Sequence, residues 1–266
     1  MTTKFRLWTI AIISAIFSVQ CTTDKSETPT IPTSVEDYFR AETFTHNGFT
    51  LAYQESTIAP SSAGKAALVV VLHGQYASGS DNKSQIRTDA LIQTWHYLST
   101  NNVKAVLVAP QCPTSRSWDE VSNGTGNSMI QVVKAFVDSY STKANISPSH
   151  IYILGYADGP KSSGAGGVWR LLSTYTDTFA AGMCVAAEPD ESIVAANVAK
   201  TPVLSVKGEM NSYAVALTLD SFADEVRDYG GVIREEVLPV RSRGDVCREA
   251  FSKELLDWVF QYSKNR

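Results

Sequence analysis

Short, continuous apolar runs alternate along this chain with longer stretches whose apolar residues recur at helical spacing. A run that is apolar throughout suits a strand buried on both faces, as in a parallel sheet covered by helices. The expected strands are residues 67–72, 103–109, 151–154, 183–187, 203–206 and 232–238. The expected helices are residues 83–99, 128–140, 167–175, 213–229 and 248–262. This alternation predicts an α/β fold, with a doubly wound, mostly parallel sheet.

An earlier segment follows a different pattern. Residues 42–54 alternate polar and apolar side chains around Asn47-Gly48, a pair that favours a tight hairpin turn. We therefore expect an antiparallel hairpin at one edge of the sheet. The sequence shows neither an internal repeat nor a second domain boundary, so residues 39–266 are expected to form a single domain.

The composition is that of a globular protein, at 44% hydrophobic and 19% charged residues. These proportions exclude a disordered, collagen-like or coiled-coil chain. The formal net charge of -4 provides no basic surface for nucleic acid or an anionic membrane. The four cysteines and four histidines do not combine into a zinc-binding spacing. We accordingly expect no metal, no cofactor and no nucleic-acid partner.

The N-terminus has the features of an export signal. Residues 2–6 carry two positive charges, and residues 7–19 form an apolar stretch too short to span a bilayer comfortably. Cys21 follows and begins a polar, proline-containing tether that runs to residue 38. This arrangement resembles a bacterial lipoprotein precursor, which implies a signal peptide over 1–20, a lipidated Cys21 and attachment to a periplasmic or outer-membrane leaflet of the cell envelope. A plain secreted protein, in which Cys21 has no role, is the alternative.

Three loops follow expected strands at the carboxyl edge of the sheet, where open α/β sheets bind their ligands. They are residues 72–82, residues 109–118 and residues 154–159. Together with the closing segment 254–258, their order and spacing resemble the α/β-hydrolase superfamily, and within it secreted esterases similar to polyhydroxybutyrate depolymerases, feruloyl esterases and phospholipase/carboxylesterases. The resemblance covers nearly all of residues 39–266 and implies a single α/β-hydrolase domain.

The catalytic positions of that family are substituted in this chain. The family uses a serine in a G-x-S-x-G turn, then an acid, then a histidine that takes the proton of the serine. The resemblance places Ala157 at the nucleophile, Asn211 at the acid and Arg243 at the histidine. An arginine stays protonated and cannot act as the base. None of the histidines lies beyond the elbow; they are His46, His73, His96 and His150.

A displaced nucleophile is the competing interpretation. Counting back from Trp169 places Ser162 at the serine position, after an insertion. Ser162 would still lack a histidine, and an unassisted hydroxyl is a poor nucleophile near neutral pH. The simpler interpretation is that residues 160–167 form a Gly/Ser-rich loop that enlarges the elbow.

The resemblance also implies a pocket around the first loop. His73, Gly74 and Gln75 lie where the family forms part of its oxyanion hole, and Asp158 directly follows the nucleophile position. Trp118 lies where members of the family have a residue that overlooks the pocket. For His73 the alternative is that it only holds its loop, and for Trp118 that it only packs in the core.

The cysteines leave one further question open. Cys112 and Cys247 fall on loops at the same end of the expected sheet and could pair in an oxidising compartment. Separate buried thiols are the alternative, because spacing alone fixes no disulfide geometry. Cys184 lies within an apolar strand and is expected in the core.

Three functions are compatible with these features. The first is a catalytically degenerate esterase-like lipoprotein of the bacterial cell envelope, a binding or accessory protein for an ester-bearing or glycan-like ligand. The second is an active carboxylic ester hydrolase that uses Ser162. The third is a purely structural envelope protein with a vestigial cleft. The only attachment the sequence predicts is the lipid anchor, and it identifies no protein partner.

Overall fold

The computed structural model describes residues 30–58, 63–121, 124, 126–159, 163–209, 213–239 and 242–264. The expected signal peptide, Cys21, Ser162 and Asn211 lie outside these residues. Residues Ile31–Arg266 form one compact unit. Within the described ranges, no helix combines the length and the apolar character needed to cross a bilayer.

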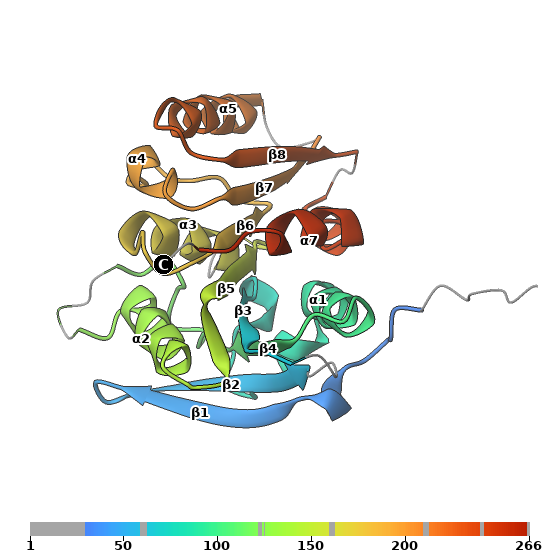
Figure 1. The fold of residues 1–266 in the computed structure, drawn as a ribbon. Helices are drawn as coiled ribbons and strands as arrows, with labels where there is room; N and C mark the ends of the chain where they lie inside the picture. Colours follow the sequence, from blue (N-terminus) through green and yellow to red (C-terminus); the bar gives the residue numbers. More distant parts are fainter. Residues whose placement is uncertain are drawn as a thin grey trace, which may run out of the picture. The chain divides into compact units, whose positions relative to one another are not determined.

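A single eight-stranded sheet forms the centre of this unit, with the strand order β1-β2-β4-β3-β5-β6-β7-β8 (Figure 1). β1 and β2 pair antiparallel around the turn at Asn47 and Gly48, whose φ angles of 47° and 78° suit a tight hairpin. β2 also pairs antiparallel with β4, and all later pairs are parallel. This confirms the predicted mostly parallel sheet with an antiparallel edge hairpin. The strands are β1 (Arg40–His46), β2 (Phe49–Ile58), β3 (Ala66–Leu72), β4 (Ala105–Pro110), β5 (Ile146–Tyr156), β6 (Ala181–Val185), β7 (Val203–Gly208) and β8 (Ile233–Leu238).

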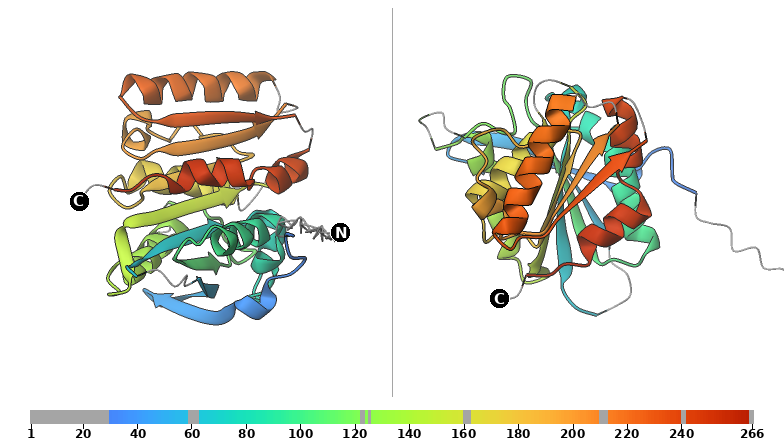
Figure 2. Two further views of the ribbon diagram at one scale, coloured as in Figure 1. Left: turned by 45° about the vertical axis from the view of Figure 1, so that its right-hand side comes forward. Right: turned by 90° about the horizontal axis from the view of Figure 1, so that it is seen from above.

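Helices cover both faces of the sheet, as the end-on view in Figure 2 shows. The helices α1, α6 and α7 pack on one face, and α2, α3, α4 and α5 pack on the other. Their bounds are α1 (Asp89–Thr100), α2 (Met129–Ser141), α3 (Gly164–Thr174), α4 (Ala195–Val198), α5 (Tyr213–Asp228), α6 (Arg243–Glu249) and α7 (Lys253–Phe260). The sheet is thus wound on both sides, as the alternating pattern predicts.

Two helix predictions need correction, and in both a hydroxyl side chain sets the boundary. The predicted helix 83–99 begins only at Asp89, because Thr88 caps it by accepting the N–H of Leu91 at 3.4 Å. The predicted helix 248–262 includes only the last two residues of α6, is interrupted at residues 250–252 and continues as α7, which Ser252 caps. The short helix α4 was not predicted, since four residues carry too little periodicity to detect.

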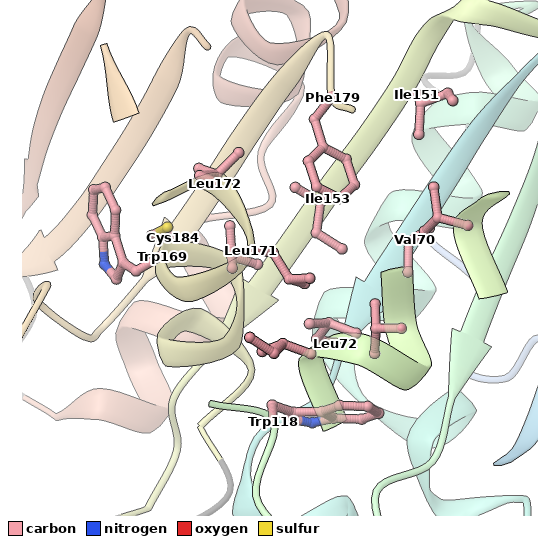
Figure 3. Packing of buried hydrophobic residues seen from close by; sticks show 14 of the residues in the cluster. Val70, Leu72, Trp118, Ile151, Ile153, Trp169, Leu171, Leu172, Phe179 and Cys184 are labelled. Atoms are coloured by element: carbon pink, nitrogen blue, oxygen red, sulfur yellow. The ribbon is translucent and has the colours of Figure 1, made fainter. Parts of the chain in front are cut away.

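The core explains why β3 is apolar along its whole length. All seven of its residues are buried, and Leu68, Val70 and Leu72 point to the face covered by α2 and α3. The alternate residues, Ala67, Val69 and Val71, point to the opposite face, which α1 and α7 cover. Figure 3 shows Leu72 between Trp118 and the side chains of α3. β3 therefore forms a rigid centre, and the loop after it is positioned by packing on both sides.

Candidate binding site at the carboxyl edge of the sheet

The turn after β5 has the glycines of a hydrolase elbow and an alanine, Ala157, between them. Ala157 is 2% exposed and occupies its central position. Its N–H donates to the carbonyl of Val185 at 2.9 Å, and its carbonyl accepts the thiol of Cys247 at 3.6 Å. The residue is thus held between the end of β6 and α6. Its side chain is a methyl group, which cannot attack an acyl carbon.

Close packing between α3 and the strands depends on two glycines. A Cβ atom on Gly155 would lie 2.4 Å from the carbonyl oxygen of Gly164, and one on Gly164 would lie 2.0 Å from that of Leu72. Both separations are too short for real atoms, so only glycine lets the first turn of α3 reach the backbone of β3 and β5. The expected loop 160–167 needs correction here, because its last four residues are already helical.

The carboxylate of Asp158 lies against the backbone of the loop after β3. The N–H of Tyr76 donates to Asp158 Oδ1 at 3.3 Å. The N–H groups of Gln75 and of Asp158 itself also form hydrogen bonds with the carboxylate. A Cβ atom on Gly74 would lie 2.2 Å from the same oxygen, so glycine is required for this approach. Burial raises the pKa of Asp158, while the N–H groups lower it.

These N–H groups have a defined role in serine hydrolases with such an elbow. The residue after the nucleophile and the loop after the third strand each supply a backbone N–H to the oxyanion. The sequence resemblance assigns this role to Asp158 and to the loop that contains Gln75. In the structure, the N–H groups of Asp158, Gln75 and Tyr76 all form hydrogen bonds with the carboxylate of Asp158. The carboxylate of Asp158 therefore lies where the N–H groups of Tyr76, Gln75 and Asp158 converge. Sequence reasoning named Asp158 as a pocket residue but could not detect this contact.

His73 uses both ring nitrogens to hold two loops together. Its Nδ1–H donates to the carbonyl of Gly74 at 2.6 Å, and its Nε2 accepts the N–H of Cys112 at 2.9 Å. The ring is 1% exposed, and burial lowers its pKa to about 4. Because both ring nitrogens are engaged and the pKa is this low, His73 is a poor base for the neighbouring elbow. The structure thus gives His73 the loop-holding role.

Trp118 lies beside His73 in the core. The indole is 0% exposed and its Nε1–H donates to the carbonyl of His73 at 3.0 Å. The two rings meet edge to face, with their centroids 5.2 Å apart. Figure 3 shows Trp118 packed beneath Leu72. Trp118 is therefore a packing residue and does not reach the surface of the site.

Arg243 is the first residue of α6, where a loop position was expected. Ser242 caps this helix by accepting the N–H of Asp245 at 3.1 Å. Burial raises the pKa of Cys247, which contacts Ala157, and that of Glu188, and the charge of Arg243 partly opposes both shifts. The structure therefore brings the start of α6 close to the elbow. Asn211, which follows β7, lies outside the described residues.

None of the four histidines places a free ring nitrogen beside Ala157. All four histidines lie in the described ranges. His96 is in α1, His150 is in the first half of β5, and His46 ends β1, at the opposite side of the sheet from β8. His73 has both nitrogens engaged. The described residues therefore contain no serine–histidine pair at the elbow.

A cavity of about 420 Å³ opens beside Asp158. Tyr76 stands in its wall with its side chain 77% exposed. Arg87 and Arg248 also line it, and they pair with Glu36 at 2.8 Å and with Asp245 at 2.9 Å. Asp158 is the lining residue that the sequence named for a pocket, and most of the others come from distant parts of the chain. The lining residues are Tyr76, Arg87, Thr88, Asp89, Ala90, Tyr156, Asp158, Gly244, Cys247 and Arg248.

The described cysteines are separate thiols. Cys112, Cys184 and Cys247 are all free and buried, so the pairing of Cys112 with Cys247 is not formed. Burial raises the pKa of Cys112 and of Cys247 to about 12. Thiols of this kind are poor nucleophiles and poor metal ligands at neutral pH. In the described part of the chain, no group of three His, Cys, Asp or Glu side chains could hold a metal ion.

Comparison with known proteins identifies the fold. No protein-family model and no curated protein matches the sequence. Among solved structures, a thermostable esterase superposes with a TM-score of 0.69 at 22% identity, covering 86% of this chain and 64% of its own. A feruloyl esterase module from Clostridium thermocellum, complexed with sinapinate, gives 0.60 at 15% identity over 88% and 92%. A ferulic acid esterase gives 0.61 at 14% identity over 84% and 98%.

The chain thus has the α/β-hydrolase fold, as the sequence resemblance predicts, and these solved structures that share it are esterases. It spans 64% of the length of the thermostable esterase.

Proposed function

We propose that this protein is a non-catalytic, esterase-like binding or accessory protein of the bacterial cell envelope, held there by a lipid on Cys21. Its ligand, ester-bearing or glycan-like, binds in the cleft at the carboxyl edge of the sheet. The observation that carries this proposal is the position of Asp158, whose carboxylate accepts the N–H of Tyr76 beside an alanine at the elbow.

Two physical effects support the loss of catalysis. A covalent acyl intermediate needs a nucleophile, and Ala157 provides none. Stabilising an oxyanion needs free N–H donors, and the carboxylate of Asp158 lies on those that the fold supplies. A second negative charge forming at that point would be repelled by the first. Restoring a serine alone would therefore leave the oxyanion unstabilised.

The competing function is ester hydrolysis through Ser162, and the esterase character of the solved neighbours favours it. Ser162 lies outside the described residues. The described histidines are the argument against it, since none lies beside the elbow with a free ring nitrogen. A purely structural role is the third possibility, and it predicts that no ligand binds.

The test is ester turnover by the purified protein. Serine hydrolases stripped of their triad retain about 10³–10⁴-fold acceleration over water from the oxyanion hole and binding. Because Asp158 also fills that hole here, we expect p-nitrophenyl acetate to be hydrolysed with less than about 10³-fold acceleration. A fluorophosphonate probe should not label the protein. Rapid turnover and labelling that Ser162→Ala abolishes, and that Ala157→Gly leaves intact, would establish the displaced nucleophile instead.

Attachment through Cys21 is tested separately. Lipidation is the only means of attachment that the sequence predicts, because the net charge is -4 and no described helix can cross a bilayer. We expect the full-length protein to sediment with membranes, and Cys21→Ser to release it into the soluble envelope fraction. Cys184→Ser is the matched control and should still sediment. Retention of Cys21→Ser on the membrane would contradict the lipid anchor.

A further inference from the structure

Tyr156 lines the 420 Å³ cavity, and its buried hydroxyl has no partner in good hydrogen-bond geometry within the described part of the chain. The residue is 3% exposed. Burial raises the pKa of Tyr156, and weak hydrogen bonds with the side chain of Thr88 and the backbone of Gly74, outside good geometry, partly oppose that shift. Buried hydroxyls are almost always well hydrogen-bonded, so one with only weak partners beside a cavity indicates a place where a ligand atom could complete the bond.

The carboxylate of Asp158, in the same wall, determines which ligand groups fit. An ester offers only acceptor oxygens, which would face a carboxylate that also accepts. A ligand hydroxyl, in contrast, can donate to Asp158 and can either donate to or accept from Tyr156. The pair therefore selects a ligand that carries hydroxyl groups on neighbouring atoms.

The remaining lining residues indicate the charge and the shape of the ligand. The exposed ring of Tyr76 offers a flat apolar face at the mouth of the cavity. Arg87 and Arg248 are each paired with an acidic side chain, so the wall presents little net charge. The two arginines would repel a cationic ligand, and Asp158 and Asp89 would repel an anionic one. A neutral ligand with one apolar face and several hydroxyls fits best.

We propose that this cavity binds a neutral sugar unit of a glycan. Ring hydroxyls donate to Asp158 and bond with Tyr156, and the C–H face of the sugar packs on Tyr76. The volume lies within the ~300–1,000 Å³ range of small-molecule sites. The proposal rests on the non-catalytic function above and names its ligand class. The aspartate that blocks an ester is in this view the residue that binds the sugar.

The experiment titrates the purified protein with neutral tetrasaccharides of β-1,4-xylose, β-1,4-glucose, α-1,4-glucose and β-1,4-mannose, followed by calorimetry. Methyl sinapate serves as the ester probe in parallel. We expect at least one saccharide to bind saturably and methyl sinapate not to bind. Losing a hydrogen bond to a charged group should make Asp158→Asn about 10-fold weaker or more. Tyr156→Phe and Tyr76→Ala should each weaken binding about 5-fold.

Two matched substitutions serve as controls. Asp177→Asn removes a carboxylate that is 95% exposed and does not line this cavity, and Tyr229→Ala removes another exposed tyrosine. Both should bind like the wild type. Thermal unfolding of each variant separates loss of fold from loss of contact, and Tyr156→Phe keeps the packing of the ring.

The outcomes separate this inference from the function on which it rests. Failure of all four saccharides to bind would overturn the sugar site, as would saccharide binding that Asp158→Asn and Tyr156→Phe leave unchanged. Binding of methyl sinapate without hydrolysis would overturn the sugar site and retain a non-catalytic binding protein. Hydrolysis of methyl sinapate would overturn the proposed function itself.

Discussion

Gly164→Ala is expected to lower the free energy of unfolding by about 3 kcal/mol or more, at the upper end of overpacking costs. The new Cβ would lie 2.0 Å from the carbonyl oxygen of Leu72 and 2.8 Å from that of His73. Both oxygens belong to backbone at the end of β3, which packing holds on both faces. Neither can move without separating α3 from the sheet.

Gly166→Ala, in the same turn of α3, is the matched control. Its nearest neighbour would be the side chain of Ser163 at 3.5 Å, an ordinary contact. Alanine is the better helix former, so this change should raise the free energy of unfolding by about 0.5–1 kcal/mol. Urea unfolding of both variants provides the measurement. Equal stabilities for the two would contradict the close contact between α3 and β3.

The second large effect is a loss of stability on mild acidification through His73. Burial lowers the pKa of its imidazole to about 4, whereas an unfolded histidine titrates near 6.5. Between these values the unfolded chain binds a proton that the folded chain does not. His73 therefore costs no stability above pH 6.5, and it lowers the free energy of unfolding progressively as the pH falls to about 4. With 1.36 kcal/mol for each pKa unit, the loss amounts to about 3 kcal/mol.

Comparison with His73→Gln isolates this contribution. Asp158 and Glu188 have raised pKa values and gain stability on acidification, so the wild-type curve alone mixes opposite effects. Glutamine does not titrate, and the difference in unfolding free energy between wild type and variant should shrink by about 3 kcal/mol from pH 7 to pH 4. An NMR titration that finds His73 protonated at pH 6 in the folded wild type would contradict the prediction, and it does not require the variant to fold.

The sequence predicted the centre of the sheet well because burial there is uniform. The expected strand 67–72 matches β3 within one residue, since every side chain in it is buried. The expected strand 151–154 captured only the end of β5, which runs from Ile146 to Tyr156. The first half of β5 contains Ser147, Ser149 and His150, and its register against β3 is irregular. Half-exposed polar residues carry no strand signal of their own.

The elbow shows the same division within the site. That residue 157 lies in a strand-to-helix turn could be predicted, because the glycines and the preceding apolar run are adjacent in the chain. The start of α3 at Gly164 could not be predicted in this way. Its start depends on the approach of Gly164 to Leu72 on another strand, and on the cap that Ser163 provides to Gly166 at 3.0 Å.

The sequence by itself determined that this chain forms a parallel α/β sheet and that alanine stands at the elbow, because periodicity and local spacing are properties of consecutive residues. Only the tertiary structure decided what the edge of the sheet presents to a ligand. Asp158 and Tyr76 are 82 residues apart, and Cys247 is 90 residues from Ala157. Such contacts form only when the packing of β3, β5 and α6 brings their ends together, and no local pattern encodes their geometry.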